Sequence, residues 1–336
     1  MRKYFIFLVM AAMVMACSVD DGPGNPPVNE DPDDEDPVDR DPSIVVPFIP
    51  GTRIVFAPQD EAGERLGTSD SYSKELSRFD LISRTKNKAS NKEEDYLNFA
   101  SQQALAWTDE EKNTLRERIL ALKARIENMG LKLEFPSEIL LVKSTMQEEG
   151  GAITYTRENY IVARGIVAES FLAHELFHIL TRHKPDRRKE LYETINFHES
   201  NRISYPDAIR EMVITNPDAP FLEHTITVKI DNVDEEVVFI LISEEEWDGG
   251  SFFTYMKQRL MYIEEVSAKK QAKLVENMPV LRNFAAATDL KQKIGTNTTY
   301  TLHPEEILAE HFVMLVLENE VPEPSFIDAM KQVLTK

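Results

Sequence analysis

The segment 171–180 places two histidines and a glutamate inside an almost wholly apolar run. Apolar residues cover nearly the whole circumference of the helix that this spacing predicts over 166–182, so that helix should be buried. Buried imidazole and carboxyl groups are costly unless they are paired or bound to a metal. This helix constrains the fold most, because whatever packs around it must satisfy His174, Glu175 and His178.

The spacing of the two histidines favours a metal site. His174 and His178 are four residues apart, so on a helix both imidazoles project from one face about one turn apart. That geometry suits two ligands of one tetrahedral zinc ion, with Glu175 beside them as a general base towards a water molecule at the metal. Two alternatives stay open: a chance His-Glu-x-x-His pattern, and a polar core that is satisfied by hydrogen bonds within the protein.

A catalytic zinc needs a third protein ligand and one open coordination position. The metzincin arrangement is excluded, because it requires a third histidine six residues beyond His178 and His183 lies only five residues on. A second apolar helix, predicted over 304–318, offers Glu306 and Glu310 on one face. Like charges at this spacing repel each other, which makes sense if a cation lies in front of them.

The motif His-Glu-Leu-Phe-His at 174–178, with a downstream Glu-x-x-x-Glu, resembles the gluzincin branch of zinc metallopeptidases, which includes thermolysin-like and lethal-factor-like catalytic domains. The resemblance implies that Glu306 is the third zinc ligand and that Glu310 orients a ligating histidine. The pattern Pro304-x-Glu306-x-x-Ala309 is similar to the setting of such ligands in this family.

The resemblance covers a minority of the chain, and its two halves lie far apart. Glu306 lies 128 residues after His178 in the sequence, a far longer separation than in thermolysin-like enzymes. An insertion holding a hairpin and further helices would explain this length. It also leaves Glu199 and Glu211 open as alternative third ligands.

The lethal-factor-like group has a tyrosine ahead of the ligand helix that stabilises the oxyanion. Tyr300 fits this role loosely and His303 could fill it instead, although either could be an ordinary loop residue. A hairpin predicted over 152–163 would supply an edge strand that pairs with an extended substrate, or would be an ordinary core hairpin. Gly249 and Gly250 indicate a flexible loop near the cleft.

Strand patterns dominate the first part of the remaining chain and helical patterns the last. A capping box of Thr108 and Glu111 predicts a helix that ends before Gly130. Strands are expected over 131–135, 139–144, 225–230 and 236–242, a helix from Pro185, and a mostly helical pattern from residue 251. This order predicts an α+β fold. The resemblance implies that 51–336 form a zincin-like, two-lobed catalytic domain with a small sheet and a mainly helical C-terminal lobe.

Residues 1–16 have the features of a bacterial lipoprotein signal peptide. Two basic residues precede an apolar run shorter than the ~20 residues that span a bilayer. Val14-Met15-Ala16-Cys17 resembles a lipobox, which implies lipidation of Cys17; an ordinary signal peptide with an incidental cysteine is the alternative. The acids that follow resemble the export signal of Bacteroidetes-type lipoproteins. An extracytoplasmic protein, anchored to the outer membrane and exposed at the cell surface, is therefore expected.

The segment 17–50 is rich in Asp, Glu and Pro, and between residues 18 and 42 ten acids are opposed by Arg40 alone. Such a segment cannot bury enough apolar surface to fold, which predicts a disordered tether. The net charge of −20 argues against nucleic acid as a partner. Cys17 is the only cysteine, which excludes intramolecular disulfides and cysteine-based zinc sites.

Together these patterns predict a zinc-dependent metallopeptidase that hydrolyses peptide bonds by a metal-activated water, with Glu175 as general base. The expected partners are a peptide or protein substrate and, through Cys17, a membrane. The alternative is a non-catalytic cell-surface binding lipoprotein with a degenerate or structural metal site. A closed site with four protein ligands would favour that alternative.

Overall fold

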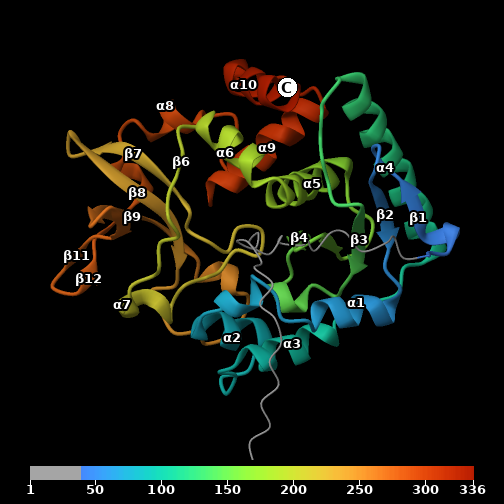
Figure 1. Cartoon of the computed structure of the whole chain (residues 1–336). Coiled ribbons are helices and arrows are strands. Elements are labelled where there is room, and N and C mark those ends of the chain that lie inside the picture. The colour runs from blue at the N-terminus through green and yellow to red at the C-terminus, as the bar shows by residue number, and fades with distance from the viewer. Residues whose placement is uncertain (1–38) are drawn as a thin grey trace, which may run out of the picture. The chain divides into compact units, whose positions relative to one another are not determined.

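In the computed structural model of the protein, residues 39–336 are described and belong to one compact unit (Figure 1). The predicted signal peptide, the lipidation site Cys17 and most of the predicted tether lie outside the described residues. Several β-sheets and ten α-helices make up the described chain, so the predicted α+β class is confirmed. Between residues 39 and 336, no helix is both long and apolar enough to cross a membrane.

A five-stranded sheet forms the first half of the fold. Its order is β1 (Val45–Pro47), β2 (Arg53–Phe56), β3 (Glu138–Lys143), β5 (Tyr160–Ala163) and β4 (Thr154–Arg157). The three inner strands are parallel, and β1 and β4 run antiparallel at the two edges. The predicted hairpin over 152–163 is therefore confirmed as β4 and β5, and β4 is the last strand of its sheet.

Helices cover both faces of this sheet. The bounds of the first four are α1 (Gln59–Leu66), α2 (Arg78–Thr85), α3 (Glu93–Ser101) and α4 (Asp109–Asn128). Side chains alternate along a strand, so Ile139 and Leu141 face the core shared with α4, whereas Leu140 and Val142 face the core shared with α1 and α3. The predicted capping box of α4 is confirmed, because Thr108 and Glu111 exchange hydrogen bonds at its start.

Two expectations about this half are wrong. The folded chain begins before residue 50, since β1 pairs with β2 and Val46 and Phe48 are buried. The acids stop at Asp41, and the apolar residues that follow are enough to add an edge strand to the sheet. The segment 131–135 is not a strand: its apolar side chains are buried, but it pairs with no strand of residues 39–336, and its Lys132 N–H donates to the carbonyl of Leu334.

A second sheet, entirely antiparallel, forms the other side of the fold. Its order is β10 (Lys269–Ala272), β9 (Lys257–Val266), β8 (Val233–Ile242), β7 (His224–Ile230) and β6 (His198–Glu199), with β13 (Leu281–Arg282) also paired to β9. A separate pair, β11 (Leu274–Val275) and β12 (Met278–Pro279), lies between these strands in sequence. The second predicted hairpin is thus confirmed as β7 and β8.

The mostly helical pattern expected from residue 251 is wrong over 257–282, and so is the mainly helical C-terminal lobe. In β9, Leu260 and Tyr262 belong to one hydrophobic core, and Met261 and Ile263 belong to another. A strand buried on both faces shows a continuous apolar run without alternation, which periodicity cannot distinguish from a buried helix. Helices return only with α8 (Leu290–Ile294) and the two that follow it.

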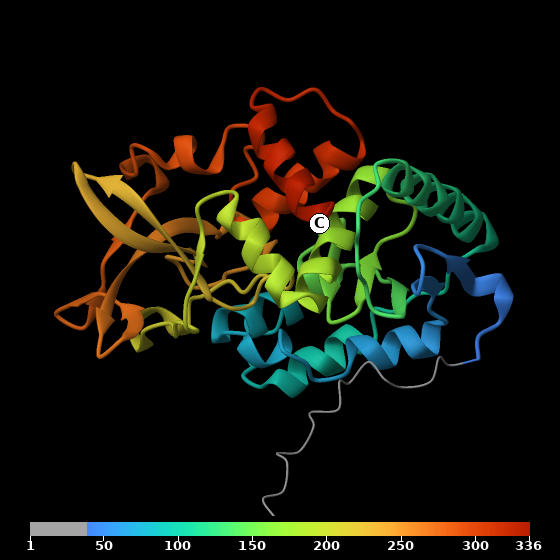
Figure 2. The ribbon, with the colours of Figure 1, turned by 45° about the horizontal axis from the view of Figure 1, so that its top comes forward.

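Two helices that carry the candidate site lie between the sheets. These are α5 (Glu169–His183) and α9 (Pro304–Val316), which pack side by side with α6 (Pro185–Glu193) and α10 (Pro324–Leu334) around them (Figures 1 and 2). The short α7 (Asp207–Arg210) precedes the second sheet. Ala173 and Ala309 are both buried in the shared core, where their small side chains permit close helix packing.

Candidate metal centre

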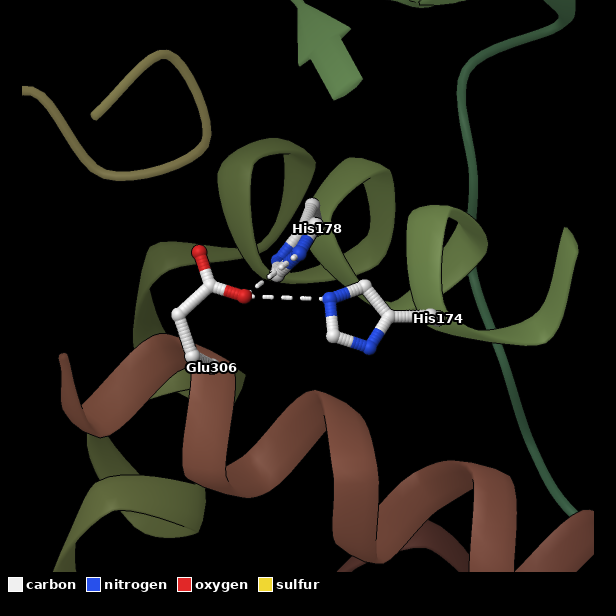
Figure 3. A group of neighbouring side chains, drawn as sticks. All are labelled: His174, His178 and Glu306. Carbon is white, nitrogen blue, oxygen red and sulfur yellow. Dashed lines mark hydrogen bonds and ion pairs between the residues drawn. The ribbon is translucent and has the colours of Figure 1, made fainter. Parts of the chain in front are cut away.

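The two histidines of α5 point their Nε2 atoms at one oxygen of Glu306 on α9 (Figure 3). The distance to Glu306 Oε2 is 3.0 Å from His174 Nε2 and 3.7 Å from His178 Nε2. One ligand atom from each of the three side chains lies within 4.8 Å of the others. The structure thus brings together the three residues that the sequence proposes as ligands, with a donor set of two imidazoles and one carboxylate.

Each imidazole is held from behind by a second carboxylate. The distance from Glu310 Oε1 to His174 Nδ1 is 3.0 Å, and from Glu305 Oε1 to His178 Nδ1 it is 3.1 Å. A proton on each Nδ1 satisfies these contacts and leaves the lone pair of each Nε2 facing Glu306. Glu310 therefore lies where the resemblance expects it.

Glu305 is a site residue that the sequence analysis missed. Its side chain is buried and accepts hydrogen bonds from the Thr181 hydroxyl at 2.5 Å and the Tyr192 hydroxyl at 2.6 Å, besides its contact with His178. Its position in the sequence could have indicated this role, because a buried carboxylate in the first turn of an apolar helix needs a partner.

Asn216, also missed, orients the carboxylate of Glu306. Its side-chain nitrogen donates a 2.6 Å hydrogen bond to Glu306 Oε1, which leaves Oε2 for the two imidazoles. Burial would raise the pKa of Glu306, but the two histidines and Asn216 outweigh it and lower the pKa to about 2. Glu306 is therefore an anion at neutral pH, as a metal ligand must be.

The carboxylates around the two histidines favour a positive charge at the site. Burial alone would lower the pKa of His178, but the charges of Asp218 and Glu306 raise it to about 9 in the metal-free protein. Two buried polar atoms, His178 Nε2 and Glu175 Oε2, have no hydrogen-bond partner among residues 39–336. A cation between the two imidazoles and Glu306 would take the place of the proton and give His178 Nε2 its missing partner. The residues present thus fit a bound metal ion.

Glu175 lies beside the ligands without belonging to their group. Its side chain is buried, and burial, with the charge of Asp218, raises its pKa to about 7. A carboxylate with this pKa can both take up and release a proton near neutral pH. One ligand atom of Asp218 lies within 4.8 Å of those of Glu175 and His178. Asp218 is the third residue that the sequence analysis missed; it lies in an Asn-Pro-Asp turn that carries no metal-binding signal.

The proposed oxyanion residue lies at the site, and its alternative does not. The ring of Tyr300 is 6.1 Å from that of His174 between centroids, and Tyr300 lines a cavity of about 390 Å³ with His174, Glu175 and Glu306. His303 instead caps the start of α9, where its Nδ1 accepts the Glu305 N–H at 3.1 Å.

The two alternative third ligands lie on other surfaces. Glu199 pairs with Lys189 at 3.0 Å, and Glu211 faces Arg78 at 3.9 Å. Both carboxylates are largely exposed, and neither belongs to a group of side chains within residues 39–336 that could hold a metal.

The cavity beside the three proposed ligands has an apolar rim. Ile153 and Phe253 are exposed there, and Phe171 and Val313 line the same space. Gly249 and Gly250 both have positive φ angles in the loop that leads to Phe253. An apolar opening beside polar groups that converge on one point is typical of a ligand-binding site.

The chain matches no protein-family model, and no curated protein or solved structure shows significant similarity to it. The functional argument therefore rests on the side chains of the site.

Proposed function

We propose that the protein is a zinc-dependent metallopeptidase with a zincin-like catalytic domain. His174, His178 and Glu306 would hold the metal, and Glu175 would act as general base. The observation that carries this proposal is the convergence of both Nε2 atoms on Glu306 Oε2, while a separate carboxylate holds each Nδ1. Histidine ligands backed by carboxylates are characteristic of zinc sites.

The donor set favours zinc over harder cations. Two imidazoles and a carboxylate suit zinc, whereas calcium and magnesium prefer a shell of oxygens. Three protein ligands leave one coordination position open, and the buried Glu175 lines the same cavity as His174 and Glu306. An open position beside a general base is typical of catalytic rather than structural zinc.

Bound zinc would supply Lewis-acid activation of a water molecule and of the peptide carbonyl. Glu175 would accept the proton of the water at its free Oε2 and pass it to the leaving amine, a cycle that suits its pKa of about 7. Tyr300 would donate its hydroxyl hydrogen to the developing oxyanion. An extended peptide would pair with the edge strand β4 and place side chains in the apolar rim of the cavity.

We also propose that the protein is an outer-membrane lipoprotein anchored through Cys17 and exposed at the cell surface. The lipobox-like sequence and the acids that follow it support this placement. A peptidase in that position would meet peptides outside the cell.

One observation favours a second candidate function. Asp218 lies within reach of His178 and Glu175, and its carboxylate would close the site if it bound the metal as a fourth protein ligand. The protein would then be a non-catalytic surface binding lipoprotein with a structural metal.

The deciding experiment compares Glu175→Gln with the unaltered chain for zinc content and for hydrolysis of a mixed fluorogenic peptide library. Glu175→Gln should keep one zinc per chain and lose at least about 10³-fold in rate, because the isosteric amide cannot take up the proton. Glu169→Gln, in the first turn of the same helix, is the control and should keep both its zinc and its rate of hydrolysis. Full activity in Glu175→Gln overturns the mechanism. A zinc-loaded chain that cleaves nothing supports the binding alternative.

A further inference from the structure

The outer edge of β4 is engaged by a loop of the same chain. Thr156 gives its backbone N–H and its hydroxyl to Asp218 Oδ1, both at 2.7 Å. β4 is the last strand of its sheet, so this N–H points away from β5. An unpaired edge of this kind is where an extended peptide would add as a further strand. Asp218 therefore takes a hydrogen bond that a bound peptide would need.

The segment 215–219, here called the cover segment, is fastened at both ends. Arg182 donates to the carbonyl of Pro217 at 3.5 Å and to that of Asp218 at 3.3 Å. At the other end, Arg84 donates to the Thr215 carbonyl at 2.7 Å, and Asp80 accepts the Thr215 N–H at 3.1 Å. The cover segment is thus held in one position by side chains outside it.

The cover segment also divides the space around the site. Asp218 lines the cavity of about 390 Å³ at the ligands, a second of about 260 Å³ beside Tyr192 and a third of about 80 Å³ beside Phe252. Asp218 is thus a lining residue common to all three cavities. An extended peptide running along β4 has to pass through the position of Asp218.

Hydrogen bonds from Thr156 hold Asp218 in this closed position. A peptide carbonyl can accept the same backbone hydrogen bond from Thr156 when a peptide adds to this strand edge. A peptide can thus compete for the strand edge.

We propose that the cover segment is an intramolecular inhibitor of peptide binding, with Asp218 occupying the strand-edge position that the backbone of a bound peptide takes. It moves aside when an extended peptide replaces it on Thr156. The inference rests on the proposed peptidase function, and it adds that the resting protein is closed to its substrate.

The test uses the full chain, Asp218→Ala, and Asp248→Ala as a control at an exposed aspartate that pairs with Lys88. Amide hydrogen exchange at Thr156 in the zinc-free protein should be at least about tenfold faster in Asp218→Ala than in the unaltered chain, because the acceptor is gone. The affinity of the zinc-loaded protein for a peptide hydroxamate should rise at least about tenfold, with zinc content unchanged. Asp248→Ala should match the unaltered chain in both measurements.

Unchanged exchange at Thr156, or a hydroxamate affinity that stays the same or falls, overturns the proposal. Loss of zinc in Asp218→Ala also overturns it, because Asp218 would then be a ligand. If no variant binds zinc, the proposed function fails, while hydrogen exchange still decides whether Asp218 covers β4. Should Asp218→Ala fail to fold, Arg182→Gln is the second variant. It removes the Arg182 hydrogen bonds that fasten the cover segment but keeps the Asp218 side chain, and it should shift both measurements in the same direction.

Discussion

The side-chain nitrogen of Asn216 lies 2.6 Å from Oε1 of Glu306, a residue 90 positions further along the chain. This bond fixes the carboxylate so that its other oxygen faces His174 and His178. A loop of the second half of the chain therefore sets the geometry of a ligand on α9, and it does so without contributing a ligand.

Replacing Asn216 with alanine should weaken zinc binding by about 10- to 100-fold, because the Glu306 carboxylate becomes free to rotate. Competition with a chromogenic chelator measures this affinity. Asn201→Ala is the matched control, since Asn201 donates to the carbonyl of Lys270 on the exposed surface and should leave the affinity unchanged. Equal affinities in the two variants would contradict a role for Asn216 at the metal.

The two carboxylates behind the histidines should behave differently when each is changed to glutamine. Both changes should weaken zinc binding by about 10- to 100-fold, because each replaces the charged acceptor behind an imidazole with a neutral amide. Only Glu305→Gln should also lower the free energy of unfolding of the zinc-free protein, by about 1–3 kcal/mol, because Glu305 is buried among three donors. Glu310 is partly exposed. Urea unfolding would count against this distinction if the two variants were equally destabilised.

A buried ion cluster holds the anchor of the cover segment. Arg84 is 1% exposed and contacts the carboxylates of Asp80 and Glu149 as well as the Thr215 carbonyl. Arg84→Met should lower the free energy of unfolding by about 3–5 kcal/mol, since it leaves two buried carboxylates without their cation. Arg78→Met, an exposed position of the same helix, should change it by less than about 0.5 kcal/mol. Similar values for both would contradict the cluster's role.

His311 should make the zinc-free protein sensitive to acid. Both of its ring nitrogens lack a partner within residues 39–336, and burial lowers its pKa from 6.5 to about 4. A depressed histidine pKa stabilises the fold fully above pH 6.5, and that contribution is lost as the pH falls towards 4. The loss amounts to about 3 kcal/mol.

His311→Phe keeps an aromatic ring against Phe326 and removes the titrating group. The free energy of unfolding in urea should be measured for both zinc-free proteins at pH 7 and at pH 4. Between these two pH values the unaltered chain should lose about 3 kcal/mol more than the variant. Parallel profiles would rule out His311 as a source of the acid sensitivity.

The helices and the ligand types of the site could be predicted from the sequence. His174, His178 and Glu306 lie in apolar runs with helical spacing, where a polar residue stands out because burial makes it costly. The same argument could have found Glu305. Glu310 is predicted on the same helix face as Glu306, and only its role behind a histidine came with the family pattern.

The residues that complete the site could not be found in this way. Asn216 and Asp218 belong to a loop whose position depends on tertiary contacts, so no local pattern marks them. β9 was mistaken for helix because both of its faces are buried, and the first edge strand was missed because acids dominate the segment before it. Local periodicity fails where the surroundings, rather than the spacing, decide the structure.

The central claim is that His174, His178 and Glu306 form a zinc site. Its most direct test is the zinc content of the purified full chain by mass spectrometry after dialysis, compared among Glu306→Ala and the two exposed alternatives, Glu199→Ala and Glu211→Ala. The account predicts one zinc per chain in the unaltered protein and in both alternatives, and almost none in Glu306→Ala. A chain without zinc, or zinc retained in full by Glu306→Ala, would contradict it.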